Sequence, residues 1–126
     1  MQLLSPTLKE ISLHGTKSFP CAIYHTRSTG KGTLVKHHWH DEVEILYFSD
    51  GEFRLEINME QYFVPSEALY FINPGELHSI YTEKTSDSGE DAIVFSLDTL
   101  SFDSYDAAQM QLIQPIQNGK MLFPRC

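Results

Sequence analysis

The amino-acid sequence predicts an all-β fold, a sandwich or a barrel, that ends in a short helix. The first observation is a series of short runs rich in β-branched and aromatic residues, and the second is the set of turn residues that separate them at close, regular spacing. The third is the pattern of residues 52–57, where apolar side chains at Phe53, Leu55 and Ile57 alternate with charged ones. One face of the sheet is therefore expected in a core and the other in water.

Length and composition indicate one domain, because 126 residues with 41% hydrophobic side chains suffice for one core. We expect strands at 19–26, 33–40, 43–49, 52–57, 61–64, 68–72, 77–81 and 92–97. Residues 83–91 have the composition of an exposed loop, and 103–114 show a helix-compatible pattern that Pro115 ends. Within the single domain 1–126, we expect an N-terminal arm or extra strand at 1–18, a β-barrel at 19–97 and a covering segment at 98–126.

The charge of the chain argues against direct contact with nucleic acid. The formal net charge is −8 at pH 7, the wrong sign for a surface that neutralises phosphates. The N-terminus lacks the pattern of a signal peptide, and the longest apolar run, 68–72, is far too short to cross a bilayer. Cys21 and Cys126 have no metal-knuckle spacing, which favours unpaired thiols in a reducing compartment. A cytoplasmic protein without membrane contact is predicted.

Four side chains form a candidate metal site. Alternation along a strand places His38 and His40 on one face, and Glu44 has the same parity if no bulge intervenes. His78 follows the turn at 73–75 and is expected to reach back across the barrel. Neutral imidazoles with one carboxylate suit a divalent zinc, iron, nickel or manganese ion.

A small-molecule pocket is expected at the barrel mouth, where parity with the metal-ligand candidates selects Leu46, Phe48 and Ile80 as lining residues. The histidines and the glutamate have a second interpretation, a buried hydrogen-bonded network or a polar ligand floor without metal. Metal binding is favoured slightly, because four unpaired polar groups inside an apolar barrel are costly.

The remaining titratable residues carry weaker signals. His37 has the parity of a surface residue, and His14 and His25 have no motif support. Glu90 and Asp91 are interpreted most simply as part of a solvated loop.

The spacing of these residues resembles the two motifs of the cupin family. Every position of the first motif is present, at Gly32, His38, His40, Glu44 and Gly51. In the second motif Gly75 and His78 match, while Glu67, Asn73 and Thr82 replace the family's Gly, Pro and Asn. The resemblance implies a double-stranded β-helix jelly roll with His38, His40, Glu44 and His78 as the metal set.

A narrower resemblance covers most of the chain. The segments 19–20, 38–47, 51–53, 71–78 and 119–124 are similar to the N-terminal effector-binding and dimerisation domain of AraC-type transcription regulators. In that family two helix-turn-helix units normally follow and bind DNA, and nothing after Cys126 supplies them. We therefore expect a truncated regulatory domain or a stand-alone cupin.

Three functions follow as hypotheses. The first is a homodimeric, non-catalytic domain that binds a small effector, a sugar or another metabolite, possibly through a metal in the barrel. The second is a small metal-dependent cupin enzyme, a dioxygenase or isomerase, for which the sequence offers no placed base or arginine clamp. The third is a dimerisation module with an empty barrel.

Overall fold

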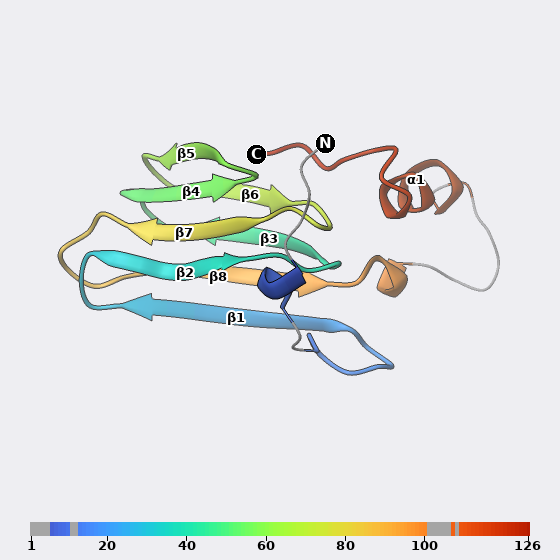
Figure 1. Cartoon of the computed structure of the whole chain (residues 1–126), viewed down its shortest axis with the longest axis horizontal. Coiled ribbons are helices and arrows are strands. Elements are labelled where there is room, and N and C mark those ends of the chain that lie inside the picture. The colour runs from blue at the N-terminus through green and yellow to red at the C-terminus, as the bar shows by residue number, and fades with distance from the viewer. Residues whose placement is uncertain (1–5, 11–12, 101–106, 108) are drawn as a thin grey trace.

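The computed structural model describes residues 6–10, 13–100, 107 and 109–126. Within this part of the chain, eight strands form two four-stranded antiparallel sheets (Figure 1). The strands are β1 (Cys21–Ser28), β2 (Gly32–His38), β3 (Val43–Phe48), β4 (Phe53–Ile57), β5 (Glu60–Val64), β6 (Ala68–Ile72), β7 (His78–Thr82) and β8 (Ser88–Phe95).

The strand order identifies the topology. One sheet runs β1-β8-β3-β6 and the other β2-β7-β4-β5. Because most consecutive strands lie in opposite sheets, the chain winds between the two layers as a double-stranded β-helix, the cupin jelly roll. The predicted all-β fold class is confirmed, with one short C-terminal helix, α1 (Gln114–Gln117).

The main core lies between the inner faces of the sheets. The alternation predicted for 52–57 is confirmed, since Phe53, Leu55 and Ile57 are buried and Arg54 is exposed. The opposite sheet contributes Leu46, Phe48, Tyr70, Ile72 and Ala92 to the same cluster. These apolar side chains fill the barrel below the end at which β2 finishes and β3 begins.

The C-terminal segment covers one end of the barrel. A 3₁₀ turn at Leu97–Leu100 follows β8, and a π-helical turn at Gln109–Ile113 leads into α1. The helix expected at 103–114 lies partly outside the described residues. Pro115 stands in the first turn of α1 and does not end the helix, because its fixed φ and missing N–H suit that position. Ile116 packs with Val43 and Leu97 in a second, smaller apolar cluster.

The interpretation of 83–91 as a solvated loop is wrong for its second half. β8 begins at Ser88 and pairs with β1 along its whole length, with Glu90 opposite Thr26. Both Ser88 and Glu90 are buried. Pairing between segments about 60 residues apart leaves no mark in local composition, which is dominated here by polar and acidic residues.

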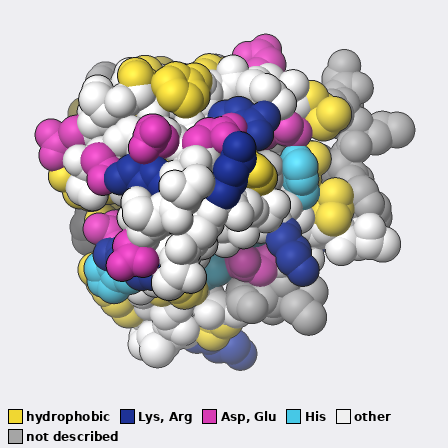
Figure 2. All heavy atoms as spheres, turned by 90° about the vertical axis from the view of Figure 1, so that its left-hand side faces the viewer, with side chains coloured by type: hydrophobic (Ala, Val, Ile, Leu, Met, Phe, Trp, Pro, Cys, Tyr) yellow, Lys and Arg dark blue, Asp and Glu magenta, His cyan; other side chains and the backbone are white. Residues whose placement is uncertain are grey.

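The opposite end of the barrel carries charged side chains of both signs. Figure 2 shows this end, where β1 and β3 finish and β2 starts, with acidic and basic groups close together. Glu83 pairs with Lys31 at 3.3 Å and with Arg54 at 2.5 Å, and Lys84 pairs with Asp50. Among the helices of the described residues, none combines the length and the apolar character that crossing a membrane requires.

Candidate metal centre and cavity

The site forms where the chain leaves one sheet and enters the other. β2 ends at His38, and β3 begins in the opposite sheet, so that Glu44 approaches the centre from the far side. His40 lies in the crossing between them. The shared parity of His38, His40 and Glu44 is expected only without a bulge between them; in the structure β2 ends at His38, and these residues come together because the chain crosses the barrel mouth.

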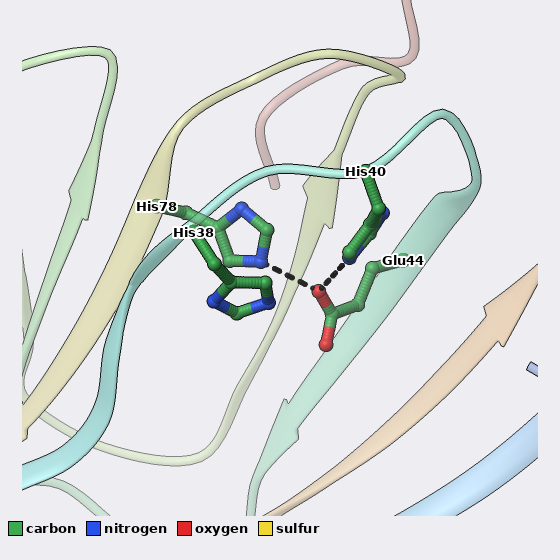
Figure 3. A group of neighbouring side chains, drawn as sticks. All are labelled: His38, His40, Glu44 and His78. Atoms are coloured by element: carbon green, nitrogen blue, oxygen red, sulfur yellow. Dashed lines mark hydrogen bonds and ion pairs between the residues drawn. The ribbon is translucent and has the colours of Figure 1, made fainter. Parts of the chain in front are cut away.

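Four ligand atoms converge at this crossing. His38, His40, Glu44 and His78, the first residue of β7, each place one donor atom within 4.8 Å of the others. Figure 3 shows the three rings gathered around the Glu44 carboxylate, whose Oε2 lies 3.2 Å from His40 Nε2 and 2.8 Å from His78 Nε2. The centroids of the His38 and His78 rings are 4.3 Å apart. All four predicted metal-ligand candidates therefore lie in one cluster.

The backbone fixes the orientation of each ring. His38 Nδ1 lies 2.9 Å from the carbonyl of Lys36, and His40 Nδ1 lies 3.1 Å from that of Glu42. His78 Nδ1 lies 2.8 Å from the carbonyl of Glu76. A carbonyl only accepts hydrogen bonds, so each Nδ1 carries a proton, and in the neutral ring the Nε2 lone pair faces the centre. This arrangement is typical of metal-ligating histidines.

Contacts within the cluster and burial together shift the pKa values of Glu44, His38 and His40. Burial alone would raise the pKa of Glu44, but the close contacts of its carboxylate with the rings of His40 and His78 hold the pKa of this carboxyl well below its ordinary value. Burial and the neighbouring His78 lower the pKa of His38. The pKa of His40 is raised, because its contacts with Glu44 outweigh its burial. At neutral pH the centre thus offers the Glu44 carboxylate and the neutral imidazole of His38, while a metal ion would compete with a proton at His40.

A divalent transition metal fits this donor set. Three imidazole nitrogens and one carboxylate oxygen are preferred ligands of zinc, and they also suit iron, nickel and manganese. His40, Glu44 and His78 are buried and His38 is half-buried, which leaves one side of the cluster open.

That open side faces a cavity of about 220 Å³ between the sheets. Its wall combines the histidine cluster with carboxyl and hydroxyl groups and a few apolar side chains. The lining residues are Glu10, His14, Tyr24, Thr26, Val35, His38, His40, Glu44, Glu90, Ala92 and Val94. A larger hollow of about 700 Å³ lies at the opposite end of the barrel, where no histidine lines it.

The three residues expected to line the pocket lie deeper than the cavity. Leu46, Phe48 and Ile80 are fully buried members of the main core and are absent from the cavity wall. Their side chains do point inward, as parity indicates for Leu46 and Phe48 alongside Glu44. Parity selects the face of a strand, but packing decides which inward residues fill the core and which meet open space.

Sequence reasoning missed several cavity residues. The N-terminal segment bridges to Trp39 and thereby places Glu10 and His14 in the wall. His14 is buried, is paired with Glu10, and has its Nδ1 2.5 Å from the hydroxyl of Tyr24. Nothing in local spacing identifies these two residues, because the bridge joins segments about 30 residues apart.

The turn before His78 is tied to the C-terminal segment. Asn73, which replaces the proline of the second cupin motif, is buried and exchanges two hydrogen bonds with the backbone of Phe123, at 2.7 and 3.2 Å. Arg125 donates two hydrogen bonds to the Glu76 carboxylate, at 2.8 and 2.7 Å. These contacts give the departure from the motif a structural role, since a proline has no side-chain amide to bind Phe123.

The comparisons with known proteins agree with this geometry. The family model described as AraC-like ligand binding domain matches residues 20–101. The uncharacterized HTH-type transcriptional regulator YdeC of Bacillus subtilis is 31% identical over 86 residues, which are 68% of this chain. The chain spans 30% of the length of that relative.

Solved structures share the fold at low identity. A predicted oxalate decarboxylase from Thermotoga maritima has a TM-score of 0.54 at 22% identity, over 60% of this chain and 65% of its own. The cupin domain of Schizosaccharomyces pombe Cnp3 has a TM-score of 0.56 at 12% identity, over 88% and 70%. ToxT from Vibrio cholerae has a TM-score of 0.50 at 9% identity, over 64% and 32%.

At such identities these structures support the cupin fold alone. The family model carries the assignment, because it matches well over half of the chain. The chain belongs to the AraC-like ligand binding domain family.

Proposed function

We propose that this domain senses a small effector for a transcription regulator, binding it in the 220 Å³ cavity against the histidine and glutamate cluster. The observation that carries the proposal is that three imidazole rings and one carboxylate converge at the wall of that cavity. The relative with 31% identity is an HTH-type regulator, which supports sensing over catalysis. In a longer regulator, the contact with DNA would belong to another domain.

We further propose that His38, His40, Glu44 and His78 hold one divalent transition metal. When bound, the ion would supply a Lewis-acidic position for an oxygen atom of the effector. The chain's own residues orient the site, since backbone carbonyls fix the rings and the apolar core below excludes water. Small ligands then enter only from the cavity side.

Elemental analysis tests the metal. Wild type loaded with zinc, nickel, iron or manganese and then desalted is expected to keep about one ion per chain, whereas His40→Ala is expected to keep far less. His37→Ala is the matched control, because His37 lies outside the cluster, on the surface, and bonds Glu56 at 2.8 Å. Equal metal content in all three proteins would refute the assignment.

Titration calorimetry with sugars, organic acids and other metabolites tests effector binding on the same samples. Binding by wild type that His40→Ala weakens, with the fold intact, is the expected result. If the metal-loaded protein instead turns over a cupin substrate such as oxalate, and His40→Ala abolishes the turnover, the sensing role is wrong and an enzymatic one replaces it. The cytoplasm is the compartment that this function requires.

We also propose that the domain forms a homodimer through the outer face of the β1-β8-β3-β6 sheet. Ile23 and Ile93 are paired across β1 and β8 and are 64% and 39% exposed, and Ile45 is paired with Ile93 on the other side. A row of apolar side chains on a solvent-facing sheet is typical of an interaction surface. Sedimentation velocity should show a dimer that Ile93→Lys dissociates and Ile93→Thr weakens less; a monomeric wild type would refute it.

A further inference from the structure

Glu90 stands apart from the other acidic residues of the cavity wall. Glu10 pairs with His14, and Glu44 pairs with His40 and His78. Glu90 is 3% exposed, has no ion pair among the described residues, and its Oε2 is buried without a hydrogen-bond partner.

Glu90 and the cluster of His38, His40, Glu44 and His78 approach the cavity from different positions along the sheet. On β8 the inward side chains are Glu90, Ala92 and Val94, and Val94 is paired with Glu44 on β3. Glu90 is four residues from Val94 on the same face of β8, and its side chain lines the same cavity as Glu44. The cavity wall therefore contains two polar parts, the cluster and Glu90, and the apolar side chains of Ala92 and Val94 follow Glu90 along β8.

Neither lysine nor arginine is among the lining residues, and the described histidines of the wall form ion pairs with Glu10 and Glu44 but none with Glu90. The nearest guanidinium, that of Arg27, bonds the backbone carbonyl of Glu90 and the carboxylate of Asp91, each within 3.0 Å. The hydroxyl of Thr26 donates a hydrogen bond to the Glu90 carboxyl group and so favours its ionised form, but Thr26 carries no charge that could balance it. A buried carboxylate without a counter-ion is costly, so a cation that enters the cavity gains affinity by supplying one.

The ionisation of Glu90 agrees with this geometry. Burial, followed by the negative charge of Glu44, raises the pKa of Glu90 to about 7. Asp91 raises it further, while Thr26 and Arg27 act in the opposite direction.

We propose that the cavity selects small ligands that carry a protonated amino group, with the ammonium against Glu90 and oxygen atoms directed toward the histidine cluster. Pockets that bind drug-sized ligands have volumes of about 300–1,000 Å³. The cavity here is smaller, at about 220 Å³, so its ligand is of amino-alcohol or amino-sugar size. An anionic ligand beside Glu90 would meet an unbalanced carboxyl group. The inference rests on the proposed use of this cavity for effector binding.

Matched probes test the selectivity. Ethanolamine, ethylene glycol and glycolate form one set, and glucosamine, glucose and glucuronate form another. In each set the second compound carries a hydroxyl in place of the amino group, and the third is a hydroxylated carboxylate of similar size. Each probe is titrated by calorimetry into wild type, Glu90→Gln and Glu60→Gln. Glu60 is the control because it is an exposed glutamate outside the cavity wall, next to Tyr62.

An amine of either set should bind wild type and Glu60→Gln alike and bind Glu90→Gln at least tenfold more weakly. Circular dichroism establishes that Glu90→Gln is folded. If a hydroxyl or carboxylate probe binds as tightly as its amine, with Glu90→Gln unchanged, the selectivity is refuted while the cavity remains an effector site. If none of the six probes binds wild type, the selectivity is refuted as well. The proposed function is tested separately, by the broader ligand titrations and by the metal content of His40→Ala.

Discussion

Replacing Glu90 by glutamine should stabilise the protein above neutral pH and leave its stability nearly unchanged in mild acid. The pKa of Glu90 is about 7 in the folded chain, against 4.5 for an ordinary glutamate. Because the folded state binds this proton more tightly than the unfolded state, the free energy of unfolding falls as the pH rises from about 4.5 through 7. At 1.36 kcal/mol per pH unit, the cost to wild type at pH 8 reaches about 3 kcal/mol.

Glutamine has nearly the same shape as glutamate and never ionises, so the variant avoids this cost. We expect urea denaturation at pH 8 to give Glu90→Gln up to about 3 kcal/mol more stability than wild type, with a similar dependence on urea. At pH 4 the two midpoints should nearly coincide, because this pH lies below both pKa values and Glu90 is then mostly protonated in the unfolded as well as the folded wild type. Other titrating groups are common to both proteins, so the difference isolates Glu90.

Glu60→Gln is the control and should follow wild type at both pH values, since Glu60 is exposed. A Glu90→Gln protein less stable than wild type at pH 8, or a difference independent of pH, would show that Glu90 is balanced by a charge or well solvated, contrary to its position in the structure.

Three further outcomes are expected. Arg125→Met should lower the free energy of unfolding by about 2 kcal/mol, because it removes two charge-assisted hydrogen bonds from buried Glu76. Since these contacts lower the pKa of Glu76, denaturation curves should show the full loss of stability above about pH 5 and a smaller loss at lower pH, where Glu76 becomes protonated. Gly51→Ala should cost about 3 kcal/mol, since the new Cβ would lie 2.1 Å from the carbonyl oxygen of Pro65, whereas Gly30→Ala, with open space around it, should cost little; equal melting temperatures would refute this. A bound metal should dissociate below about pH 6 as the imidazoles bind protons, and metal retained in full at pH 4 would argue against histidine ligation.

The cluster of His38, His40, Glu44 and His78 could be predicted from the sequence because the spacing of its first three members along the chain is short and regular. His38 and His40 end a strand, Glu44 begins the next, and His78 follows a turn, so short-range order already brings each residue to the barrel mouth. The alternation of 52–57 is equally local, and its core face is confirmed.

The rest of the site depends on pairings between distant segments. Glu90 is acidic and sits in a polar stretch, and only its register with Thr26 on β1 turns it inward. Glu10 reaches the cavity because the N-terminal segment forms a bridge to Trp39. No periodic pattern in the sequence predicts this bridge. The depth of Leu46 within the barrel depends on how neighbouring side chains pack, a property that parity along one strand does not contain.

The three ring anchors have a consequence for sequence variation. His38 and His40 are held by the main-chain oxygens of Lys36 and Glu42, and not by the side chains of those residues. Every amino acid presents the same oxygen, so the neighbours of the histidines are free to change identity without turning the rings. Side chains of the cavity wall can therefore vary while the three rings keep the orientation that their main-chain contacts give them.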